Sequence, residues 1–62
     1  MITAGLDVGA QTVKAAILAD GKLLAHSIVL CGIDRKGSID QALNEALQRA
    51  EINRQEIKSI VS

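Results

Sequence analysis

The sequence predicts an α/β domain in which three antiparallel strands precede a helix and a fourth strand that returns parallel to the first. Three short segments rich in β-branched and small apolar residues are separated by turn signals. A longer segment then has the 3.6-residue apolar period of an amphipathic helix. The last apolar segment gives the returning strand, because parallel neighbours need a crossover connection.

The predicted strands are residues 2–6, 12–19, 22–30 and 57–61. The first is a continuous apolar run, which is typical of a strand buried on both faces. Asp20-Gly21, between the second and third strands, is the strongest short-range hairpin signal in the chain.

The helix prediction rests on a single apolar stripe. Ser38 and Gln41 have the spacing of a capping box, which predicts that the helix begins at Ser38 and that residues 32–37 form a loop. Asn53 and Glu56 repeat this spacing and predict one further helical turn before the last strand. The residues of the stripe are Ile39, Ala42, Leu43, Ala46, Leu47 and Ala50.

The chain is small for an independent domain. It has 62 residues, of which 48% are hydrophobic, but no Phe, Tyr or Trp. Small chains of this kind usually need a disulfide, a metal or a partner to be secure, and Cys31 is the only cysteine. We therefore expect residues 1–62 to be the incomplete N-terminal part of a larger domain, or a homo-oligomer.

The charge and hydropathy patterns exclude several classes of function. Seven basic and seven acidic residues cancel, so nothing favours electrostatic binding to nucleic acid or to an anionic membrane surface. No apolar stretch approaches the length of a membrane-spanning helix, and the N-terminus does not resemble a secretion signal. A cytoplasmic protein is expected.

Residues 4–14 are the most informative stretch. Asp7-Val8-Gly9 ends an apolar run, a polar Gln-Thr pair follows, and Lys14 lies seven residues after Asp7. Asp7 is the candidate catalytic residue and can hold a hydrated Mg²⁺, while Lys14 can neutralise phosphate oxygens. The absence of a side chain at Gly9 lets a phosphate approach the backbone. The predicted phosphate-binding residues are Gly9, Ala10, Gln11, Thr12 and Lys14.

Two interpretations of this motif stay open on the residues alone. Asp and Gly are favoured in any hairpin turn, so Asp7-Val8-Gly9 is also compatible with a turn that binds nothing. The motif is neither a Walker loop nor a dinucleotide fingerprint, because both glycine patterns are absent. It resembles instead the first phosphate loop of the actin-like ATPase superfamily of sugar kinases, chaperone ATPases and actin. That resemblance implies a partial ribonuclease-H-like domain that binds ATP or ADP with Mg²⁺.

The segment between the third strand and the helix separates two branches of this superfamily. Carbohydrate kinases usually carry a long segment with aromatic and proline residues there, whereas residues 31–37 are short. The chain resembles the ATPase activators of 2-hydroxyacyl-CoA dehydratases and benzoyl-CoA reductases. Their openings are similar to Gly5-Leu6-Asp7-Val8-Gly9, Val13-Lys14-Ala15 and Asp20-Gly21-Lys22. The resemblance covers the whole chain but only about the first quarter of a family member.

The activator resemblance implies ATP hydrolysis that drives electron transfer from a [4Fe–4S] cluster, shared by two subunits, to a dehydratase or reductase. Cys31 matches no cluster motif, and one cysteine per chain cannot supply four ligands even in a dimer. We therefore expect a nucleotide loop without cluster ligands and no activity from this chain alone. The alternatives are a fragment of a sugar or small-metabolite kinase and a non-catalytic assembly module of the same fold.

Overall fold

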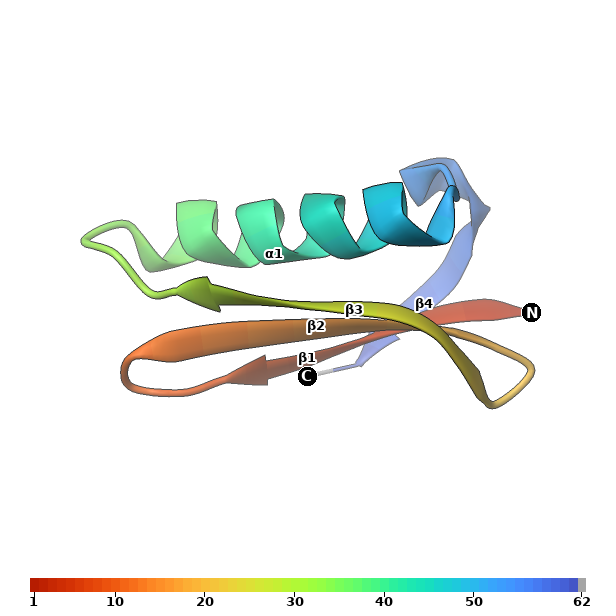
Figure 1. Cartoon of the computed structure of the whole chain (residues 1–62), viewed down its shortest axis with the longest axis horizontal. Coiled ribbons are helices and arrows are strands. Elements are labelled where there is room, and N and C mark those ends of the chain that lie inside the picture. The colour runs from red at the N-terminus through yellow and green to blue at the C-terminus, as the bar shows by residue number, and fades with distance from the viewer. Residues whose placement is uncertain (62) are drawn as a thin grey trace.

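The computed structural model describes residues 1–61 as a four-stranded sheet with a helix on one face (Figure 1). The strand order is β3-β2-β1-β4. β2 pairs antiparallel with both β1 and β3, and β4 pairs parallel with β1. This arrangement confirms the predicted fold class. The elements are β1 (Ile2–Val8), β2 (Thr12–Ala19), β3 (Lys22–Leu30), α1 (Arg35–Ala50), the 3₁₀ turn η1 (Arg54–Glu56) and β4 (Ile57–Val61).

Three strands have the bounds that the sequence predicts, and β1 is longer than expected. β1 continues two residues beyond Leu6, because Asp7 and Val8 still pair with β2. The hairpin between β2 and β3 is confirmed: Asp20 and Gly21 have φ of 51° and 84°, the left-handed conformations that a type I′ turn requires. The N-terminal ammonium group lies 2.8 Å from the Asp20 carboxylate and lowers the pKa of this exposed group.

The helix begins earlier than predicted. α1 starts at Arg35, so the predicted loop at residues 32–37 and the capping box of Ser38 and Gln41 are wrong. Asp34 is the N-cap residue and has an extended backbone. Ser38 lies in the first turn, where its hydroxyl donates to the Asp34 carbonyl oxygen at 3.1 Å. A serine hydroxyl that bonds back by four residues is an alternative to capping, and the spacing pattern does not distinguish the two.

The turn before β4 is confirmed. η1 follows Asn53, and the Glu56 carboxylate accepts the backbone N–H of Asn53 at 2.9 Å. This is the reciprocal arm of a capping box. No helix within residues 1–61 has the length and apolar character needed to cross a membrane.

The predicted apolar stripe of α1 packs against the sheet. Four of its six residues are buried, and Ile39 and Ala50 at its two ends are half-buried. The buried core residues are Ala4, Val13, Ala15, Ile17, Val29, Ala42, Leu43, Ala46 and Leu47. They form one layer between the helix and one face of the sheet.

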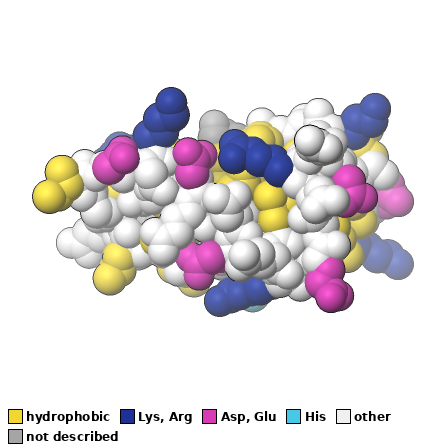
Figure 2. All heavy atoms as spheres, turned by 90° about the horizontal axis from the view of Figure 1, so that it is seen from above, with side chains coloured by type: hydrophobic (Ala, Val, Ile, Leu, Met, Phe, Trp, Pro, Cys, Tyr) yellow, Lys and Arg dark blue, Asp and Glu magenta, His cyan; other side chains and the backbone are white. Residues whose placement is uncertain are grey.

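The packing is one-sided. Only Ala4 of β1 is fully buried, so the expectation that both faces of β1 are covered is not met within residues 1–61. Seen from the α1 side, charged side chains of both signs are interspersed (Figure 2). The opposite face of the sheet carries apolar side chains that are more than half exposed, namely Leu23, Ile28 and Val61.

We predict that the chain self-associates through this open face or through the sheet edges, because exposed apolar patches and unpaired strands favour association. Sedimentation at increasing concentration should show dimers or larger species. Ile28→Thr should weaken the association, whereas Ile33→Thr should not, because Ile33 is fully exposed in the connection between β3 and α1. A monodisperse monomer at high concentration would contradict this prediction.

Candidate phosphate-binding site

The turn between β1 and β2 presents backbone N–H groups. The Gly9 N–H donates to the Thr12 carbonyl oxygen at 2.8 Å, and the N–H of Cys31, the first residue after β3, donates to the Gln11 carbonyl oxygen at 2.8 Å. The N–H groups of Ala10 and Gln11 donate to no protein acceptor within residues 1–61. The turn therefore has fixed carbonyl groups and two N–H groups available to an anion.

Gly9 lies close to the backbone on the other side of the turn. Its φ is not positive, since Gly21 is the glycine with a positive φ among residues 1–61. A Cβ at position 9 would lie 3.3 Å from the Thr12 carbonyl oxygen, which is tighter than ordinary contact, and 3.8 Å from Thr12 Oγ1. The absence of a side chain at position 9 avoids this crowding in the turn at residues 9–12.

Asp7 and Lys14 lie directly opposite each other. They are a cross-strand pair in the β1–β2 register, so their side chains project from the same face of the sheet. Both side chains are exposed, and no ion pair within 4 Å joins them. The carboxylate and the ammonium group are thus free to bind a ligand near the turn.

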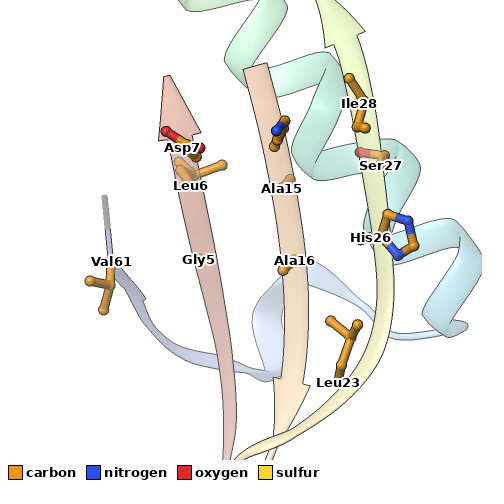
Figure 3. Close-up of a pocket in the computed structure, with 11 residues that line it drawn as sticks. Gly5, Leu6, Asp7, Ala15, Ala16, Leu23, His26, Ser27, Ile28 and Val61 are labelled. Atoms are coloured by element: carbon orange, nitrogen blue, oxygen red, sulfur yellow. The ribbon is translucent and has the colours of Figure 1, made fainter. Parts of the chain in front are cut away.

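A shallow apolar groove of about 490 Å³ runs beside this pair on the open face of the sheet. Figure 3 shows Asp7 toward one end of the groove, Leu23 toward the other, and Gly5 and Ala16 between them. A Cβ added at Gly5 would meet nothing within 4 Å. The floor of the groove is therefore open because two neighbouring strands carry almost no side chain there.

The structure brings the predicted site residues together at one end of the sheet. Residues 9–12 form the turn, and Asp7 and Lys14 flank it on the two strands that the turn connects. No group of three or more His, Cys, Asp or Glu side chains capable of holding a metal ion occurs within residues 1–61. A single carboxylate fits a Mg²⁺ ion that keeps most of its waters.

Cys31 and His26 are not brought into this arrangement as ligands. Cys31 is half-buried and its side chain packs against the core. His26 is exposed on the open face, and its carbonyl oxygen accepts from Arg49 Nη1 at 2.7 Å. The donor set does not fit a [4Fe–4S] cluster, which needs several thiolates.

The sequence did not indicate that the end of β3 supports the turn. The contact is a hydrogen bond between backbone groups of Cys31 and Gln11, so the identities of the side chains do not predict it. The strand register would have revealed it, because Thr12 lies opposite Leu30 and the next residues along each strand are Gln11 and Cys31.

Comparison with known proteins gives one informative match. No protein-family model and no curated protein sequence matches the chain. The crystal structure of the Acidaminococcus fermentans (R)-2-hydroxyglutaryl-CoA dehydratase component A is similar, with a TM-score of 0.82 and 29% sequence identity. The match covers 92% of this chain and 22% of component A, so the chain spans about a fifth of the length of the protein it resembles.

This match confirms the resemblance to the dehydratase activators and the partial actin-like fold.

We predict that the two strand-associated glycines respond differently to substitution. Gly5→Ala should leave the free energy of unfolding unchanged or raise it by up to about 1 kcal/mol, because the site is open and alanine restricts the unfolded chain. Gly9→Ala should lower it, because the new Cβ crowds the Thr12 carbonyl oxygen. Urea unfolding of the two variants measures the contrast, and equal stability would show that the turn at residues 9–12 tolerates a side chain.

Proposed function

We propose that the hairpin from Asp7 to Lys14 is the first phosphate-binding loop of an actin-like ATPase. The observation that carries this proposal is the placement of Asp7 and Lys14 opposite each other, unpaired and exposed, beside a turn with two available N–H groups. A hairpin turn without a ligand does not need these features together.

Each group has a distinct role toward a Mg·nucleotide. Asp7 would hold a hydrated Mg²⁺ ion, and that ion would supply positive charge to neutralise the phosphate oxygens. The N–H groups of Ala10 and Gln11 donate to phosphate oxygens, and the hydroxyl of Thr12 lies beside Gly9 at the same turn. Lys14 adds a positive charge on the face that Asp7 occupies.

We further propose that the loop serves an activator of a CoA-ester dehydratase or reductase. The similarity to the dehydratase component A and the short connection between β3 and α1 support this branch. Such an activator couples ATP hydrolysis to electron transfer toward its partner enzyme. The residues of this chain supply phosphate contacts only, so a cluster would need ligands from elsewhere.

Titration of the 62-residue chain with Mg·ADP and with inorganic phosphate tests the loop. The amide resonances of Ala10 and Gln11 should shift in a saturable manner, and Lys14→Gln should weaken the binding several-fold. Lys22→Gln is the matched control, because Lys22 is an exposed strand lysine at the opposite end of β2 and β3. Saturable binding that both variants retain in full would remove Lys14 from the site, and no shift at residues 9–12 would overturn the proposal.

We predict that the 62-residue chain binds nucleotide without turning it over. Hydrolysis in clamp-like phosphotransfer sites needs groups from more than one loop to orient water and neutralise charge, and one such loop is present. A phosphate-release assay with Mg²⁺ and ATP should remain at background. Steady release that Asp7→Asn abolishes would show that this loop is sufficient for catalysis.

A further inference from the structure

The connection between β3 and α1, residues 31–34, links the phosphate loop to the helix. Cys31 donates its N–H to the Gln11 carbonyl oxygen, and the next residue, Gly32, donates its N–H to Ser38 Oγ at 3.0 Å. Ser38 Oγ in turn donates to the Asp34 carbonyl oxygen. Two successive residues thus tie the loop on one side and the helix on the other, and Figure 1 shows both segments at the same end of the molecule.

We infer that the hydroxyl of Ser38 is a positioning group for the phosphate loop at residues 9–12. This inference rests on the proposed function of that loop. Ser38 touches no part of the loop itself. Its oxygen accepts the Gly32 N–H, and this bond fixes the direction of the adjacent Cys31 N–H. The Cys31 N–H in turn holds the Gln11 carbonyl oxygen. The N–H groups of Ala10 and Gln11 then stay available to a ligand.

Apart from the Cys31 side chain, which packs against the core, few side-chain contacts hold the connection. Ile33 is fully exposed, so no apolar contact of that side chain anchors the segment. Within residues 1–61, the Ser38 hydroxyl is the side-chain group that accepts a hydrogen bond from the connection. Ser38 is also buried, at 7% exposure, so water does not easily replace it.

A purely helical role does not account for both bonds. A serine in the first turn commonly donates its hydroxyl to the carbonyl four residues earlier, as Ser38 does to Asp34. In that bond the Ser38 hydroxyl is only a donor. The second bond, from the Gly32 N–H, uses the oxygen lone pair and reaches outside the helix, and it is the bond that serves the loop.

Two isosteric variants of the 62-residue chain separate these roles. Ser38→Thr keeps a hydroxyl and Ser38→Val does not, while both have the same branched shape. Hydrogen exchange at the Cys31 amide reports the contact to the loop. The dissociation constant of Mg·ADP, followed at the Ala10 and Gln11 amides, reports the consequence. Leu47→Ala serves as a control that loosens the core at the other end of α1 without touching the connection.

Ser38→Val should accelerate exchange at Cys31 relative to Ile17 in the core, and should weaken Mg·ADP binding by roughly three- to tenfold, as expected for one lost buried hydrogen bond. Ser38→Thr should stay close to the wild type in both measurements. Leu47→Ala should accelerate exchange at Ile17 and Cys31 alike.

The outcomes distinguish this inference from the proposed function. If wild-type chain binds Mg·ADP and the Thr and Val variants bind equally well, Ser38 has no positioning role although the loop binds phosphate. If wild-type chain binds neither Mg·ADP nor phosphate, the proposed function fails, and the exchange rates at Cys31 still decide whether the Ser38 hydroxyl holds the connection. Equal exchange at Cys31 in the two variants would overturn the inference.

Discussion

The structure depends on the close approach of α1 to the sheet, which small residues make possible. Ala4 and Ala15 on the sheet and Ala42 and Ala46 on the helix are each at most 1% exposed. The chain has no aromatic residue, so this layer of methyl groups, with Leu43 and a few other branched side chains, supplies the core. Tight packing of many small contacts replaces the large burial that aromatic residues give elsewhere. A larger side chain at Ala42 or Ala46 would overpack this layer and push α1 away from the sheet.

One-sided packing has a direct consequence for chemistry. Side chains alternate between the two faces of a strand, so the residues next to the buried Ala15 and Val13 face away from the helix. Lys14 is one of them, and its cross-strand neighbour Asp7 shares that face. Burying both charges in the core would require their desolvation, whereas the open face leaves them hydrated and able to exchange water for a ligand. The face that lacks a covering helix is therefore the one on which Asp7 and Lys14 stay accessible.

The sequence predicted those parts of the structure that local signals determine. The bounds of β2, β3 and β4 and the turn at Asp20 and Gly21 follow from apolar patterns and from the need for positive φ. The start of α1 was predicted wrongly, because Ser38 has the spacing of a capping residue but lies in the first turn of the helix, where its hydroxyl donates to the Asp34 carbonyl oxygen. The residues proposed for the candidate site lie together at one turn, and their roles toward a ligand stay a prediction. The contact that supports this turn was not predicted, since it joins backbone groups of residues 20 positions apart.

The short connection between β3 and α1 bears on how such a loop binds. A loop whose N–H groups are already oriented loses little conformational entropy when a phosphate arrives, and less of the binding free energy is then spent on ordering. Here the orientation comes from Cys31 and Gly32, adjacent residues that bond in opposite directions, one to the loop and one to Ser38. Extra residues inserted between them would let the two bonds form independently, and the helix would no longer restrict the loop. A long connection of the carbohydrate-kinase type would therefore need another means of ordering the same turn. In the connection at residues 31–34, the peptide bond between Cys31 and Gly32 keeps the two hydrogen-bond donors adjacent, so the bond to Ser38 and the bond to Gln11 are coupled.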